Sequence, residues 1–136
     1  LKFFCKEYFY FGEVGMGAKS KLLNNFLTLG NADLVNHLAI GAKELGLDLK
    51  KVFDVAKLGS GNSAALNRVF DNLLKGDFTG FKFTASNSVK DLTYIQDLLK
   101  DFPEAEKVAE INKNYFQKAV DQGYGENFTS KLINKK

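Results

Sequence analysis

The sequence predicts an all-α domain, a helical bundle with one long central helix. Apolar residues recur at helical spacing through most of the chain, and one such run continues from Gly15 to about Glu44. Glycines and the single proline fall between the other runs, where helices would end or begin. At 136 residues, with 45% hydrophobic and 26% charged residues, the chain has the size and composition of one globular domain.

The first twelve residues are dense in aromatic side chains. We expect residues 8–11 to form a short strand that stops at Gly12. Because every backbone donor and acceptor of a strand needs a partner, this strand would complete a sheet that lies elsewhere. A segment folded over the helical core is the alternative. We therefore divide the chain into a terminal strand, residues 1–12, and an all-α domain, residues 13–136.

The long central helix carries apolar rows on more than one side, and a helix that is apolar nearly all round is buried between other elements. About 28 residues span roughly 42 Å, more than a compact domain of this size needs, which predicts contact with another domain or subunit. Gly30 and Gly41 within the helix predict close helix packing. The rows consist of Leu22, Leu23, Phe26, Leu27, Leu29, Leu34, Leu38 and Leu45.

Two shorter helices follow. Gly46 ends the long helix as a left-handed cap would, and Asp48 caps the next helix, which buries Leu49, Val52, Phe53 and Ala56. Residues 59–63 form a turn in which Asn62 or Ser63 caps the third helix. That helix has an apolar stripe of Leu66, Val69, Phe70, Leu73 and Leu74.

An aromatic loop at residues 76–83 leads to the last helices, and its phenylalanines, Phe78, Phe81 and Phe83, must be buried. The fourth helix is expected from about Ser86 to Lys100. Pro103 begins the fifth, which runs to about Gln122 and buries Val108, Ile111, Tyr115, Ala119 and Val120. Gly123 and Gly125 break it, and a last turn follows near residues 129–133.

The composition limits the classes of binding partner that we expect. The net charge is only +3, lysines and acids are interleaved, and Arg68 is the only arginine, so we expect no nucleic-acid partner. No apolar run approaches the length of a membrane span and no signal sequence is evident, so we expect no membrane association. Cys5, the single cysteine, has no partner for a disulfide and no metal-ligand spacing, so we expect no metal and a cytoplasmic setting.

The start of the long helix carries the candidate chemistry. Its sequence is Gly12-x-x-Gly15-x-Gly17-x-x-x-Lys21-x-x-Asn24-Asn25. Lys21 and Asn25 are four residues apart and share a helix face, which Asn24 flanks. An ammonium group and a carboxamide one turn apart can together hold an oxygen that gains or loses a proton.

This string resembles the central motif of the β-hydroxyacid dehydrogenases, 3-hydroxyisobutyrate dehydrogenase and its relatives. The resemblance continues through residues 44–48, 59–63, 81–83 and 90–92, and covers roughly residues 9–134. It implies a C-terminal domain of the 6-phosphogluconate/3-hydroxyisobutyrate dehydrogenase type, joined by its first strand to an N-terminal Rossmann domain that mainly binds NAD or NADP. It also implies hydride transfer to or from a small β-hydroxyacid or its semialdehyde, and a homodimer.

The resemblance assigns roles to five residues. The family's motif lysine is the general acid or base on the substrate oxygen, which makes Lys21 catalytic and Asn25 its orienting partner. A lysine does this only where burial or a neighbouring charge lowers its pKa toward neutrality. Lys90, in the string Lys90-Asp91-Leu92, would contact the cofactor, the alternative being a surface lysine beside Asp91. Asn24 would contact the substrate, and Phe81 would either border the substrate cleft or simply pack in the core.

The chain departs from the family pattern at Asn36, where a glutamate is usual, at Ala64, where some relatives carry an aromatic residue, and near the C-terminus, where residues 127–130 replace an acidic-then-Ser pattern. The substrate pocket is therefore expected to differ from theirs. The dinucleotide fingerprint Gly-x-Gly-x-x-Gly is not in these residues, so this chain by itself should bind cofactor poorly and have no measurable activity.

Other functions fit the sequence less well. A phosphate-binding P-loop needs adjacent Gly and Lys, whereas Ala18 separates Gly17 from Lys19. Asp33 and His37, four apart on the long helix, are better explained as an ion pair on the helix surface than as a catalytic pair. The remaining alternative is a non-catalytic all-α interaction module in which Lys21 and Asn25 are surface residues.

Overall fold

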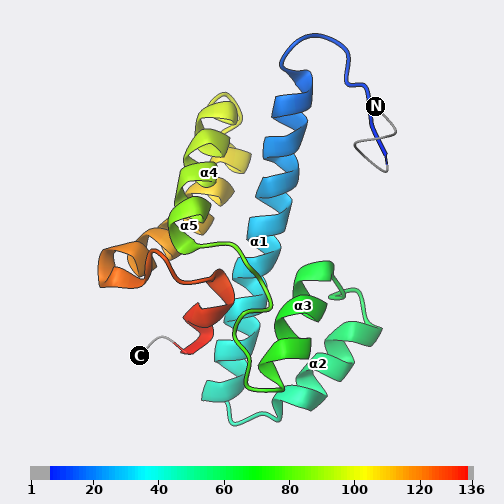
Figure 1. Cartoon of the computed structure of the whole chain (residues 1–136), viewed down its shortest axis with the longest axis vertical. Helices are drawn as coiled ribbons and strands as arrows, with labels where there is room; N and C mark the ends of the chain where they lie inside the picture. The colour runs from blue at the N-terminus through cyan, green and yellow to red at the C-terminus, as the bar shows by residue number, and fades with distance from the viewer. Residues whose placement is uncertain (1–6, 135–136) are drawn as a thin grey trace.

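The computed structural model of the chain describes residues 7–134, and within that range it contains five α-helices and no strand. Figure 1 shows α1 as the long axis, with α4 and α5 beside one part of it and α2 and α3 beside the other. The predicted all-α bundle with one long helix is confirmed. The helices are α1 (Met16–Glu44), α2 (Leu49–Leu58), α3 (Ala64–Leu73), α4 (Ala85–Leu98) and α5 (Pro103–Ala119), followed by the π-helical turn η1 (Val120–Tyr124) and the 3-10 helix η2 (Thr129–Asn134).

Side-chain caps set where three of the helices begin. Asp48 accepts a hydrogen bond from the Lys51 backbone N–H at the start of α2, as predicted. Ser63 rather than Asn62 caps α3, accepting from Leu66 N–H at 3.1 Å. Thr84 caps α4, so this helix begins one residue before the predicted Ser86. The fifth α-helix ends at Ala119 because the chain passes into the π-helical turn, where Gly123 has a φ of 86°.

The apolar side chains form two cores that share α1. One core lies between the C-terminal half of α1, α2 and α3; it includes Phe53 and Phe70, whose rings stack with centroids 5.4 Å apart. The other lies between the N-terminal half of α1, α4 and α5, and is centred on Phe116, Leu92 and Ile95. The long helix therefore gives both halves of the bundle a common support.

The loop at residues 76–83 crosses α1 between the two halves (Figure 1). Ser130 of η2 holds it, because its hydroxyl donates to the Phe78 carbonyl at 2.7 Å and accepts from the Phe81 N–H at 3.3 Å. Phe81 is buried, and Phe83 and Phe78 pack partly buried against the cores, as predicted. The loop is thus a fixed part of the fold.

One prediction for the long helix is wrong within the described residues. We expected its apolar rows to be buried on all sides, but Leu23, Leu27, Leu34 and Leu38 are exposed. Val108 and Ile111 of α5, predicted to be buried, are exposed beside them, because they point into the same open groove as Leu27 and Leu34. We call these six residues the leucine face.

The two glycines in the interior of α1, Gly30 and Gly41, also differ from expectation. A Cβ atom at Gly30 would make only an ordinary contact, 3.6 Å from Asn112 Nδ2, and one at Gly41 would meet nothing within 4 Å. Close helix packing therefore explains neither glycine within the described chain.

The strand expected at residues 8–11 depends on a sheet outside the described residues, and it stays a prediction. Residues 7–11 have no regular secondary structure, and all four aromatic side chains at 8–11 are exposed. The predicted segment 1–12 lies partly, at residues 1–6, outside the described range. No helix in the described part of the chain is both long and apolar enough to cross a membrane.

Candidate active site

The glycine-rich motif places its polar residues on one exposed face near the start of α1. Gly15 has a φ of 91°, in the left-handed region, and the helix begins directly after it. Lys21, Asn25 and Thr28 follow at spacings of four and three residues, so they point in nearly the same direction. Lys21 and Asn24 are exposed and Asn25 is half-buried. The Thr28 hydroxyl donates to the Asn24 carbonyl at 2.8 Å.

Asn25 is tied to α4 by a hydrogen bond across the bundle. Its Nδ2 donates to Asp91 Oδ2 at 2.9 Å, although the two residues are 66 positions apart in the sequence. Because a carboxylate only accepts, this bond fixes which end of the amide faces α4 and leaves Asn25 Oδ1 turned elsewhere. This bond thus joins the glycine-rich motif at the start of α1 to the Lys90-Asp91-Leu92 string of α4.

Asp91 also holds Lys90. The Lys90 ammonium lies 3.8 Å from Asp91 Oδ1, and the Lys90 side chain is 58% exposed whereas that of Asp91 is 15% exposed. No role was predicted for Asp91, the neighbour of Lys90. Its position in the Lys-Asp-Leu string was the available signal, but that string does not show which side chain faces α1.

Phe81 serves the core and the site together. Its ring is 7% exposed and packs with the core around α3. It also lines a small cavity of about 70 Å³ with Asn25, Thr28, Leu29 and Phe83. The predicted substrate contact is therefore placed beside Asn25, about one turn along α1 from Lys21.

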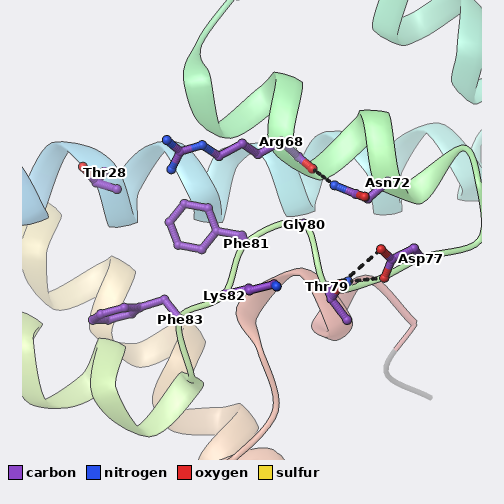
Figure 2. A pocket seen from close by; sticks show the side chains of 9 residues that line it. All are labelled: Thr28, Arg68, Asn72, Asp77, Thr79, Gly80, Phe81, Lys82 and Phe83. Atoms are coloured by element: carbon purple, nitrogen blue, oxygen red, sulfur yellow. Dashed lines mark hydrogen bonds between the residues drawn. The ribbon is translucent and has the colours of Figure 1, made fainter.

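A larger pocket of about 620 Å³ opens next to this cavity and shares Thr28, Phe81 and Phe83 with it. Figure 2 shows its wall, which combines Arg68 and Asn72 of α3 with the crossing loop. The Asp77 carboxylate accepts from the Thr79 hydroxyl and backbone N–H, and these bonds lower the pKa of Asp77, so that it is a carboxylate at neutral pH. No sequence motif marks this pocket, because its residues come from three separate segments.

The Asp33–His37 pair lies away from this site and differs from the expected surface ion pair. His37 Nδ1 is 2.8 Å from Asp33 Oδ1, but the Asp33 side chain is almost fully buried, and this burial raises its pKa against the opposing effect of His37. The His37 ring packs on Tyr115, with centroids 4.6 Å apart. Burial raises the pKa of Tyr115 to about 12.

Asn36, the departure from the family's glutamate, has a structural role. Its Nδ2 donates to the Thr129 carbonyl at 2.8 Å and to the Tyr115 hydroxyl at 3.2 Å. The residue is completely buried, and these bonds join α1, α5 and η2. A neutral amide can make them without the cost of burying a charge.

Described residues 7–134 contain no group of three His, Cys, Asp or Glu side chains that could hold a metal ion. The candidate site brings together two lysines, two amides, a carboxylate and aromatic walls. Such a set can hold and move a proton on a small oxygen-bearing molecule.

Residues 15–135 match the family model described as NAD-binding of NADP-dependent 3-hydroxyisobutyrate dehydrogenase. The chain belongs to the 3-hydroxyisobutyrate dehydrogenase family. Six chains of solved structures match it. One is the crystal structure of 3-hydroxyisobutyrate dehydrogenase from Salmonella typhimurium, with a TM-score of 0.78 and 25% sequence identity over 88% of this chain.

The family assignment agrees with the all-α fold, which matches the Salmonella enzyme with a TM-score of 0.78. The matched region covers 42% of the Salmonella dehydrogenase, so the present chain spans less than half the length of that relative. Comparison with curated protein sequences gives no match.

Proposed function

We propose that this chain is the C-terminal domain of an NAD(P)-dependent oxidoreductase of the 3-hydroxyisobutyrate dehydrogenase type. Its substrate is a small β-hydroxyacid or the matching semialdehyde. The observation that carries the proposal is the Asn25–Asp91 hydrogen bond, which joins the motif on α1 to the Lys-Asp-Leu string on α4 beside Lys21. An interaction module has no evident need to pair these two motifs.

Lys21 is the general acid or base in this proposal. The nicotinamide cofactor, when bound, supplies the hydride acceptor or donor. As the alcohol is oxidised, Lys21 Nζ takes the hydroxyl proton, and in the reverse direction it returns that proton to the carbonyl oxygen. Asn25, oriented by Asp91, presents the free side of its amide to the same oxygen or to Lys21.

The site needs a second domain to complete it. Lys21 is exposed in this chain, whereas proton transfer of this kind works best where water is excluded. We infer that an N-terminal Rossmann domain covers this face, holds most of the cofactor, and takes residues 8–11 as the terminal strand of its sheet. Lys90, exposed on α4 beside Asp91, fits a contact with an anionic part of that cofactor from the helical side.

We also infer a homodimer formed through the leucine face. Leu27 is 65% exposed and Leu34 70%, and with Val108 and Ile111 they line a groove of about 390 Å³ between α1 and α5. Large contiguous apolar patches are rare on monomeric soluble proteins. The α1 leucines of this face are turned by roughly 100 to 160° around the helix axis from Lys21, so a second copy would leave the catalytic face free.

The catalytic proposal is tested by Lys21→Ala in the protein that joins this chain to its dinucleotide-binding domain. Hydride transfer is followed by nicotinamide absorbance with β-hydroxyacids, semialdehydes and both cofactors. We expect kcat to fall by about 10²-fold or more, because the reaction loses its general acid or base. Lys19→Ala is the matched control, an exposed lysine on the same helix turned well away from Lys21. Equal activity in both variants would remove Lys21 from the mechanism.

The dimer is tested by sedimentation of Leu27→Glu, with Leu58→Glu as its control. Both leucines are exposed, but Leu58 lies on α2, outside the groove. We expect the parent and Leu58→Glu to sediment as dimers and Leu27→Glu as a monomer, since a carboxylate cannot be buried there without a partner. A parent that is monomeric at high micromolar concentration would exclude this interface.

A further inference from the structure

The pocket beside the catalytic face carries two cations that the proposed function does not use. Arg68 and Lys82 both line it, and Arg68 is the only arginine in the chain. Neither side chain forms an ion pair with any carboxylate in the described residues, although the charge of Lys82 acts on Asp77. In Figure 2 the Arg68 side chain extends from α3 toward Thr28, over the Phe81 ring.

The base of this pocket is rigid. A Cβ atom at Gly80 would lie 2.1 Å from the Arg68 carbonyl oxygen, so the loop backbone rests directly on α3. The same carbonyl accepts from Asn72 Nδ2 at 2.9 Å. On the other side, Ser130 holds the backbone of Phe78 and Phe81. The backbone segments that carry Arg68 and Lys82 are therefore packed against each other.

The chemistry of the lining favours an anionic ligand. The one carboxylate, Asp77, already accepts two hydrogen bonds from Thr79. The Arg68 guanidinium and the Lys82 ammonium supply donors only, and a guanidinium matches the paired oxygens of a carboxylate or phosphate. Phe81 and Phe83 add an apolar wall suited to a carbon chain.

The pocket borders the catalytic face. Thr28 borders both the pocket and the small cavity that reaches Asn25. At a helical rise of 1.5 Å per residue, Thr28 lies roughly 5 Å along α1 from Asn25 and roughly 10 Å from Lys21. An acyclic molecule roughly 10 Å long with its reacting oxygen at Lys21 would extend along α1 to Thr28, toward which the Arg68 side chain points.

We propose that Arg68, with Lys82 adding positive charge from the loop, forms a subsite for a second anionic group of the substrate, a carboxylate or phosphate at the end remote from the carbon that is oxidised. This inference rests on the proposed function for the orientation of the substrate, but anion binding by the subsite does not depend on hydride transfer. The substrate class is thereby narrowed from small β-hydroxyacids in general to those with two anionic groups.

Anion binding is tested on the chain itself by NMR. Because Arg68 is the only arginine, its Nε–H gives one unambiguous side-chain signal. Acetate and inorganic phosphate are titrated at constant ionic strength. We expect one of them to shift this signal and the Gly80 and Phe81 amides to saturation, and the anion that saturates at the lower concentration indicates carboxylate or phosphate.

Three variants decide whether the subsite is responsible, with the loop amides as the readout. Arg68→Gln should weaken anion binding at least about tenfold. Arg68→Lys should weaken it less, since lysine keeps the positive charge and loses only the paired N–H donors of the guanidinium. Lys51→Ala, an exposed lysine on α2, should bind as the parent does. Shifts that never saturate, parent-like binding by Arg68→Gln, or equal weakening by Lys51→Ala would each overturn the subsite.

The substrate class is tested with the two-domain protein. Arg68→Gln should raise KM at least about tenfold for a hydroxyacid with a remote carboxylate or phosphate, and leave KM for the matching neutral-ended acid and kcat for both unchanged. An equal effect on both acids would overturn the assignment. Absence of hydride transfer with any substrate would refute the proposed function, whereas the NMR titration would still decide the subsite.

Discussion

Gly80→Ala is the substitution whose effect follows most directly from the structure. The added Cβ would lie 2.1 Å from the Arg68 carbonyl oxygen, 2.9 Å from its carbonyl carbon and 3.0 Å from Asn72 Nδ2. Two of these atoms belong to the α3 backbone, which cannot rotate away as a side chain can. The loop must therefore move off α3 by about 1 Å to restore ordinary contact distances.

The expected cost combines overpacking with strained hydrogen bonds. Overpacking in a well-packed region costs about 1 to 3 kcal/mol. Displacing the loop also weakens the bonds of Ser130 to Phe78 and Phe81, each worth about 1 kcal/mol. We expect Gly80→Ala to lower the free energy of unfolding by about 2 to 4 kcal/mol, and Tm by about 10 °C.

The assay is urea unfolding followed by circular dichroism, with Gly17→Ala as the matched control. Gly17 lies in the first turn of α1, and a Cβ there would meet nothing within 4 Å. Alanine at this position should leave stability unchanged or raise it by up to about 1 kcal/mol. An unfolding midpoint for Gly80→Ala equal to that of the parent would show that the loop does not rest on α3 as described.

Two further substitutions test the polar interior. Ser130→Ala should lower the free energy of unfolding by about 2 kcal/mol, because the buried Phe81 N–H and Phe78 carbonyl lose their partner. Urea unfolding measures this loss, with Ser60→Ala, on an exposed turn, as the control. Equal stability of the two variants would contradict the role of Ser130. Asp33→Asn tests the pH dependence of stability. The folded-state pKa of Asp33 is raised above 3.8, so the protonated Asp33 contributes stability below pH 3.8, and this contribution is lost as pH rises through the raised pKa. At neutral pH the Asp33 carboxylate therefore lowers the stability of the fold. Asp33→Asn should therefore be more stable than the parent at pH 7, by a margin that shrinks toward pH 4 in urea unfolding; a margin independent of pH would refute this assignment.

Local signals were sufficient for most of the helices. Capping residues, glycines and Pro103 act on the turn in which they occur, so their effect is visible without tertiary structure. The capping of α2 by Asp48 followed from them, and the start of α5 at Pro103 is as predicted. At α3 the structure decides between the two predicted caps in favour of Ser63, and α4 begins one residue before its predicted start.

The burial of the long helix was harder to predict, because periodicity identifies apolar rows but not what covers them. Leu29 and Leu27 are equally apolar in the sequence, yet Leu29 is buried against α4 and α5, whereas Leu27 faces an open groove. The difference depends on where α5 crosses α1. No local pattern contains that information.

The sequence by itself determined the helical class, the helix order and the motif that places Lys21 and Asn25 on one face, because these depend on residues within a few turns of each other. Only the tertiary structure decided that Asn25 meets Asp91, that Ser130 and Gly80 hold the crossing loop, and that Arg68 stands beside Phe81. Each of these contacts joins segments remote in the sequence. Their geometry follows from the packing of two cores on one helix, which is a property of the whole chain.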